Sequence, residues 1–178
     1  MKNIKIILLC FLFLVACTPA VRIAKSEAAP GFALANYKTF NFYEITSDSE
    51  TSDPAYNNRI NILKTAIQQA LTAKGLTHSP TNPDLLVNIG IVTTEKVQTR
   101  ETTFREAPRY VGQRRYSWKS QEVEVGRYRE GTVTVDLVDA ANNAMVWEGV
   151  AEAVIPRQEA QLQKTVQKGV NKLLGDLK

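Results

Sequence analysis

The sequence predicts an α+β fold, a two-layer sandwich in which two helices cover one face of a mostly antiparallel sheet of about five strands. Two segments carry apolar residues at three- and four-residue spacing, which is typical of helices with one buried face. Five segments alternate apolar and polar residues, which is typical of half-buried strands. The first helix lies between two strands, so it can connect a parallel pair through a right-handed crossover.

The chain begins with the features of a bacterial lipoprotein signal peptide, which we assign to residues 1–16. Two lysines precede an apolar run of eleven residues that ends at Ala16. A membrane-spanning helix needs about 20 residues, so this run is too short to cross a bilayer and fits a signal peptide. Cleavage after Ala16 would leave Cys17 with its thiol and amine free for acylation. The alternative is an ordinary secretory signal with an incidental cysteine.

Residues 17–31 are predicted to form the lipidated cysteine and a flexible tether, and residues 32–178 a single α+β domain. Pro19 and Pro30-Gly31 bound the tether. The chain after the signal is long enough to bury a core of its own. It contains no second apolar run of membrane-spanning length.

Charge and cysteine content exclude several classes of function. Loss of the two lysines in the signal lowers the formal net charge from +4 to +2, and so small an excess does not indicate nucleic-acid binding. Cys10 leaves with the signal and Cys17 would carry lipid, so no disulfide or cysteine metal site remains. We therefore expect no metal, no cofactor and no nucleic-acid partner.

The domain is predicted to open with a strand at residues 37–43, where aromatic residues alternate with polar ones. A polar loop follows, and Asp53 and Pro54 are a typical N-cap and first residue of a helix. The apolar stripe of this helix is formed by Ile60, Leu63, Ile67, Ala70 and Leu71. The helix is predicted to end at Lys74-Gly75-Leu76, with a left-handed backbone at the glycine.

The second half of the domain is predicted to be a meander closed by a helix. The expected strands cover residues 84–97, 120–125, 132–138 and 145–154, with a polar segment at 98–119, a turn at 126–131 and a hairpin loop at 139–143. One face of the last strand gathers Met145, Trp147, Gly149, Ala151 and Ala153. Pro156 is predicted to open the last helix, whose apolar stripe is Leu162, Val166, Val170, Leu173 and Leu177. Gly169 lies inside this helix, where we expect a close contact with the sheet.

Several short motifs follow one another in a definite order. They are the lipobox ending at Cys17, Tyr37-Lys38-Thr39-Phe40, Lys74-Gly75-Leu76, Asn82-Pro83-Asp84-Leu85, residues 131–139 and Met145-Val146-Trp147-Glu148-Gly149. Together they resemble bacterial envelope lipoproteins of a domain-of-unknown-function family, DUF4136, over nearly the whole chain after the signal. That family often has a basic residue after the tryptophan, where this chain has Glu148. The resemblance implies an envelope lipoprotein with an α+β domain, and it implies no activity.

Candidate catalytic groups are few. His78 is the only histidine, which excludes a two-histidine metal helix, and we expect it in a surface turn. Glu122 and Glu124 would lie about 7 Å apart on one strand face, a spacing that some glycosidase carboxylates use. Alternating glutamates on an exposed strand are much commoner than a catalytic pair. We therefore predict no catalytic residue.

Residues 100–129 combine eight basic side chains with four glutamates and interleaved aromatic residues. Arginine binds phosphates and carboxylates in a forked geometry, and aromatic faces stack on sugars or guanidinium groups. One interpretation is therefore a site for an anionic envelope component, and the other is a long solvated hairpin or loop whose aromatic residues pack on arginine side chains. The tentative binding residues are Arg109, Arg114, Arg115, Tyr116 and Trp118.

These observations lead to three hypotheses for the function. The first is a non-enzymatic binding or assembly module of the bacterial cell envelope, tethered to a membrane through lipid on Cys17 and partnered by an envelope protein. The second is a direct binder of anionic glycan or lipid through residues 100–129. The third is a cell-wall hydrolase. Thr18 follows the cysteine in place of an aspartate, which favours the outer membrane, with the domain facing the periplasm.

Overall fold

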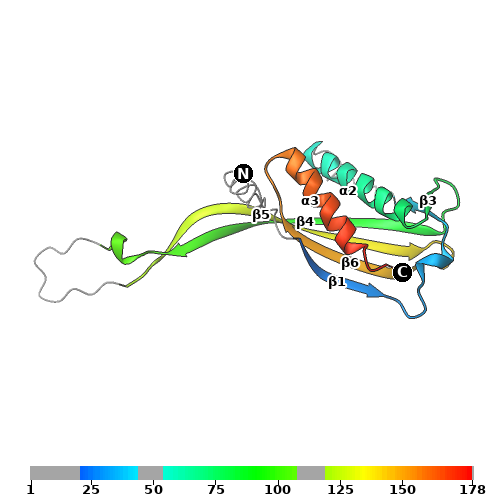
Figure 1. Cartoon of the computed structure of the whole chain (residues 1–178), viewed down its shortest axis with the longest axis horizontal. Helices are drawn as coiled ribbons and strands as arrows, with labels where there is room; N and C mark the ends of the chain where they lie inside the picture. Colours follow the sequence, from blue (N-terminus) through cyan, green and yellow to red (C-terminus); the bar gives the residue numbers. More distant parts are fainter. Residues whose placement is uncertain (1–20, 44–53, 108–118, 178) are drawn as a thin grey trace, which may run out of the picture.

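The computed structural model describes residues 21–43, 54–107 and 119–177, and it confirms the predicted α+β architecture. Two helices lie side by side on one face of a single sheet (Figure 1). The strands are β1 (Arg22–Ala28), β2 (Thr39–Phe42), β3 (Thr77–His78), β4 (Leu85–Glu101), β5 (Glu122–Asp139) and β6 (Ala144–Val154). The helices are α2 (Pro54–Ala73) and α3 (Glu159–Leu173), with short 3-10 turns η2 (Leu34–Asn36) and η3 (Phe104–Glu106).

The six strands have the order β1-β6-β5-β4-β2-β3. β4, β5 and β6 form an antiparallel meander, and β1 adds to it antiparallel along β6. β2 runs parallel to both β3 and β4, because α2 returns the chain to the end of the sheet at which β2 began. The predicted parallel pair across the first helix is therefore confirmed. None of the described helices combines the length and the apolar character needed to cross a membrane.

The end of α2 has the predicted geometry. Gly75 has a left-handed φ of 96°, and its N–H donates to the carbonyl of Thr72 at 3.0 Å. The N–H of Leu76 donates to the carbonyl of Leu71 at 3.1 Å. These two bonds form a Schellman motif, in which Leu76 and Leu71 are both buried. The predicted N-cap, Asp53, lies outside the described residues.

The core lies between the helices and the sheet. Its least exposed large side chains are Phe40, Ile67, Leu71, Leu85, Val87, Val135, Leu137 and Leu174. β6 contributes Trp147, which is also buried, and Gly149 makes room for its indole ring. A Cβ on Gly149 would lie 2.2 Å from Trp147 Cη2 and 2.9 Å from Leu173 Cδ1. The glycine is thus required by packing, because a side chain there would displace the tryptophan.

The predicted tether is wrong for its second half, because Arg22–Ala28 form the edge strand β1. Lys25 Nζ lies 2.6 Å from Glu148 Oε2, and Arg22 forms an ion pair with Glu152, so β1 is bound to β6 by charges as well as backbone bonds. Charged residues are common on edge strands, where they discourage pairing with other chains. They also interrupt the apolar alternation by which a strand is recognised in sequence.

The predicted turn at residues 126–131 is also wrong, because β5 passes through it without interruption. Gly126 pairs with Gln98 beside a bulge that skips Val125. A Cβ on Gly131 would lie 3.1 Å from Ile155 Cγ1. These glycines therefore mark a bulge and a close approach, which are two other uses of glycine in strands.

A second bulge, at Val146, changes the face on which Met145 lies. The register skips Val146 between the pairs Leu137–Trp147 and Val138–Met145. Met145 is 54% exposed, so the prediction that it shares the buried face of Trp147 is wrong. A slip of one residue moves a strand side chain to the opposite face.

The last helix begins at Glu159 rather than at Pro156, which lies in the connection from β6. The close contact expected between Gly169 and the sheet is not observed, because the glycine faces the residue before β1 at an ordinary van der Waals distance. A Cβ there would lie 3.4 Å from Cγ1 of Val21, the buried residue that precedes β1. Leu177 lies beyond the helix but is buried as predicted.

We expect Gly149→Ala to destabilise the fold by about 1–3 kcal/mol, the usual cost of overpacking a core. The added methyl would overlap the indole of Trp147. Gly90→Ala is the matched control, since a Cβ there meets only Thr134 Cβ at an ordinary 3.6 Å. Urea unfolding followed by tryptophan fluorescence measures both. Equal midpoints for the two variants would contradict the proposed packing.

Candidate functional site

The most distinctive feature of the molecule is a two-stranded arm, which we define as residues 93–107 and 119–130. Beyond the body, β4 continues to pair with β5 as far as the pair Glu101–Glu122 (Figure 1). At about 3.3 Å per residue, the paired part of the arm extends for about 30 Å. Every residue of β4 from Val92 onward is exposed. The arm therefore presents both faces of a β-ribbon to its surroundings.

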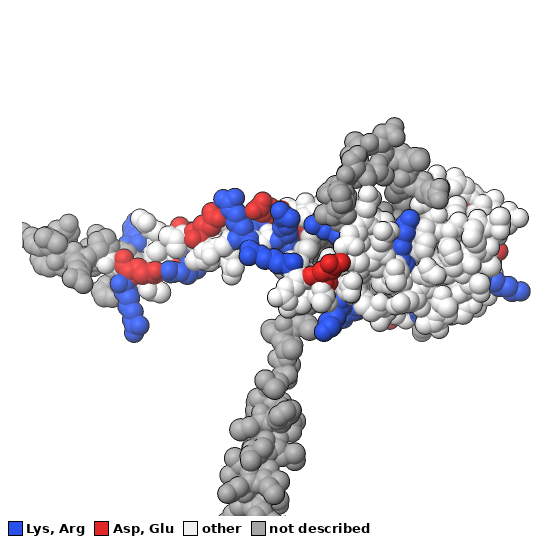
Figure 2. Space-filling view, turned by 90° about the horizontal axis from the view of Figure 1, so that it is seen from above, with Lys and Arg blue, Asp and Glu red and all other residues white. Residues whose placement is uncertain are grey.

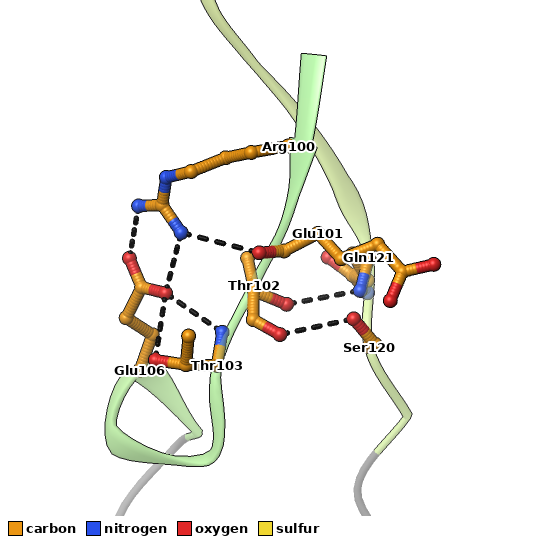
Figure 3. A network of polar contacts seen from close by, with 7 residues as sticks. All are labelled: Arg100, Glu101, Thr102, Thr103, Glu106, Ser120 and Gln121. Carbon is orange, nitrogen blue, oxygen red and sulfur yellow. Dashed lines mark hydrogen bonds and ion pairs between the residues drawn. The ribbon is translucent and has the colours of Figure 1, made fainter.

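Hydrogen bonds also join the two chains of the arm just beyond the ends of β4 and β5. The N–H of Thr102 donates to the carbonyl of Gln121 at 2.8 Å, and the N–H of Gln121 donates to Thr102 Oγ1 at 2.9 Å. Ser120 Oγ donates to the carbonyl of Thr102 at 2.9 Å (Figure 3). The pairing of the strands thus continues past the end of β4.

A second set of contacts orders η3 beside this point. The guanidinium of Arg100 binds both carboxylate oxygens of Glu106, with Nη1 2.8 Å from Oε2 (Figure 3). The N–H of Thr103 donates to the same Oε2 at 2.8 Å. These contacts lower the pKa of Glu106 from 4.5 to about 2. The hydrogen bond from Arg100 contributes most, followed by the hydrogen bonds from Thr103. The carboxylate of Glu106 therefore stays ionised to a lower pH than that of an ordinary glutamate.

The described part of the arm carries matched charges. It holds six basic residues and six glutamates. In addition to the Arg100–Glu106 pair, the described part of the arm has two further ion pairs. Lys96 Nζ lies 3.4 Å from Glu130 Oε2, and Arg127 Nε lies 2.7 Å from Glu124 Oε1. The positive excess predicted for residues 100–129 therefore comes mainly from the arginines of residues 108–118.

The predicted site residues fall in that segment and at the N-terminus. Cys17, Arg109, Arg114, Arg115, Tyr116 and Trp118 all lie outside the described residues. Their roles in lipidation and in binding stay predictions. The arm is nevertheless the element that carries residues 108–118, because those residues connect its two described halves.

The two glutamates considered for catalysis each have a local partner. Glu122 Oε1 accepts a hydrogen bond from Thr99 Oγ1 at 3.0 Å. Glu124 accepts one from Arg127, which lowers the pKa of the Glu124 carboxyl. A general acid needs a carboxyl with a raised pKa, so Glu124 has the environment of a structural ion pair on an exposed strand.

His78 lies on the surface as expected, although in β3 rather than in a turn. Its Nε2 lies 3.1 Å from Asn41 Oδ1, and its ring centroid is 5.5 Å from that of Phe40. These contacts hold the imidazole against the edge of β2. Among the described residues, no group of three or more His, Cys, Asp or Glu side chains could hold a metal ion.

An arginine-lined recess of about 610 Å³ lies at the base of the arm. Arg59 comes from α2, Arg127 and Arg129 come from β5, and Arg157 follows β6. Glu95 of β4 is the one acidic side chain among the lining residues. Figure 2 shows basic side chains, with acidic ones beside them, where the arm leaves the body. Sequence reasoning included Arg127 and Arg129 in a basic segment but missed the other two, because only the fold brings them together.

An apolar cavity of about 90 Å³ adjoins this recess, between the sheet and the two helices. Its lining includes Ile62, Ile91, Val133, Leu162 and Val166, and also Val21 at the start of the described chain. Arg59, Val154, Ile155 and Pro156 line both spaces. The base of the arm therefore offers a cationic surface next to an apolar one.

Comparison with known proteins gives a family and a fold. The family model described as "Domain of unknown function (DUF4136)" matches residues 24–177. No curated protein matches the chain. A crystal structure of a PDZ domain protein from Parabacteroides distasonis has 16% identity and a TM-score of 0.52, covering 93% of this chain. This chain spans 38% of that protein. A PelC dodecamer from Paraburkholderia phytofirmans has 16% identity and a TM-score of 0.44. The match covers 89% of this chain and 96% of the PelC chain.

We expect Arg100→Gln to raise the pKa of Glu106 from about 2 back toward 4.5, because the largest cause of its depression is removed. A group with a depressed pKa stabilises the folded state above its ordinary pKa, and this contribution is lost as the pH falls through the folded value. NMR titration of the Glu106 carboxyl carbon measures the change. Arg105→Gln removes an equal charge beside Glu106 and should leave its titration unchanged. A value still near 2 in Arg100→Gln would contradict the assigned cause.

Proposed function

The chain belongs to the DUF4136 family, and on that premise we propose that it is a membrane-tethered lipoprotein of the bacterial cell envelope that acts as a non-enzymatic binding or assembly module. The observation that carries this proposal is the arm. A two-stranded ribbon is only marginally stable by itself in water, yet this one extends well beyond the core. An element of this kind is explained by a partner that covers it.

The exposed apolar side chains of the arm support the same proposal. Val97 is 51% exposed, Val125 is 48% exposed and Tyr128 is 37% exposed. Matched charges lie between them, so a partner can bury apolar area without burying a large uncompensated charge. The edges of the ribbon also offer backbone groups for added strands.

The start of the fold supports placement close to a membrane. Val21 is buried, and Cys17 lies four residues before it. Four residues span at most about 14 Å. A chain acylated at Cys17 would therefore hold its body against the lipid surface. The proposed location is the outer membrane, with the body in the periplasm.

Direct binding of an anionic envelope component is a second candidate function. The observation that favours it is the arginine-lined recess at the base of the arm.

A photo-crosslinking amino acid placed at Val97 or Val125 should join the protein to one defined envelope partner in intact cells. Met145 is the control position, because it is 54% exposed but lies on the body at the β5–β6 hairpin. We expect the adduct from both arm positions, not from Met145, and much less of it in a Cys17→Ala chain. The adducts are identified by mass spectrometry. The same weak mixture of adducts from all three positions would contradict a binding role for the arm.

A further inference from the structure

Three of the four arginines that line the recess have no ion-pair partner among the described residues. Within the described residues, Arg59, Arg129 and Arg157 form no ion pair. By contrast, Arg127, the fourth arginine of the recess, binds Glu124, and Arg100 farther along the arm binds Glu106. The unpaired arginines come from α2, β5 and the connection that follows β6, so local sequence composition does not explain why they gather.

The acidic groups nearby leave a net positive charge. Glu95 lies across the ladder from Arg129 and lines the recess, and Glu124 binds Arg127. Four arginines thus face two carboxylates, which leaves a charge of about +2 beside open solvent. Forked guanidinium groups match the geometry of phosphate and carboxylate oxygens. The recess is therefore suited to an anion that several arginines can bind together.

The apolar cavity next to the recess indicates which class of anion would fit the site. Val154, Ile155 and Pro156 line both spaces together with Arg59, and the cavity beyond them is lined mainly by aliphatic side chains. A soluble phosphate or a charged glycan would gain nothing from this apolar surface. A lipid would, because its phosphate is covalently joined to acyl chains.

The position of the chain start points to the same kind of ligand. Val21 lines the apolar cavity. The strand that follows it, β1, starts at the end of the body where the arm begins (Figure 1). A lipid anchor on Cys17, only four residues away, would bring lipid phosphates within reach of this end of the body.

We propose that the recess formed by Arg59, Arg127, Arg129 and Arg157 binds the phosphate of an anionic membrane lipid, with the lipid's apolar part against Val154, Ile155 and the adjoining cavity. The inference rests on the proposed membrane tethering. It adds a second, non-covalent membrane contact, which would restrain the direction in which the arm leaves the lipid surface.

The test uses a chain that begins at residue 18, so that neither the signal nor acylation contributes to binding. Every described residue is kept in this chain, including Val21 and its contact with Gly169. We expect it to co-sediment with phosphatidylcholine vesicles in which about a third of the lipid is phosphatidylglycerol, but not with phosphatidylcholine alone. A basic residue near an anionic surface contributes about fivefold in affinity, so Arg59/Arg129/Arg157→Gln should weaken binding by about a hundredfold.

The control variant Lys38/Lys64/Lys74→Gln removes the same charge from positions on the body that line neither the recess nor the cavity, and it should bind within about twofold of the parent chain. Circular dichroism verifies that all three chains are folded. Equal losses in the two variants would overturn the proposal, as would full competition by millimolar inorganic phosphate, which would indicate a site for soluble anions. Because this chain carries no anchor, a failure here leaves the binding role of the arm to be judged by crosslinking alone.

Discussion

The antiparallel pairing of β4 with β5 is the interaction on which the rest of the structure depends. Over its first half, the pairing places Leu85, Val87 and Ile89 beside Leu137 and Val135, which form the sheet side of the core. β2 is attached to the start of β4, and β6 to the last part of β5. Over its second half, the same ladder continues without a core and becomes the arm. Body and arm are thus two parts of one pair of strands.

The continuity of this ladder explains how the arm keeps its shape without a hydrophobic core. Residues near the body inherit their register from strands that are fixed by packing. Farther out, the hydrogen bonds of Thr102 with Ser120 and Gln121 close the described end, and the Arg100–Glu106 pair orders η3. Exposed ion pairs contribute little to stability individually. Their role here is to set the local geometry, while the register comes from the body.

Local signals in the sequence predicted the elements whose formation depends on neighbouring residues. The Schellman motif at Gly75, the apolar stripes of both helices and the parallel pair across α2 follow from spacing and glycine position. The sequence did not reveal β1, because that strand is held by ion pairs with Glu148 and Glu152 from a distant segment. It also misplaced a turn at residues 126–131, because glycines at a bulge and at a close approach resemble turn glycines.

The candidate site was predictable only in part, for the same reason. The concentration of arginine and aromatic residues at 100–129 indicated either an anion-binding site or a long solvated hairpin or loop. The recess also needs Arg59 and Arg157, which lie outside that segment in the sequence. Recognition of β1 also shortens the predicted tether, because the described fold already includes Val21 and β1, which precede residue 32. Under the proposed anchoring, the base of the arm, the apolar cavity and the arginines all lie near the lipid surface. A partner of the arm would then be engaged beside the membrane, within about 30 Å of the body.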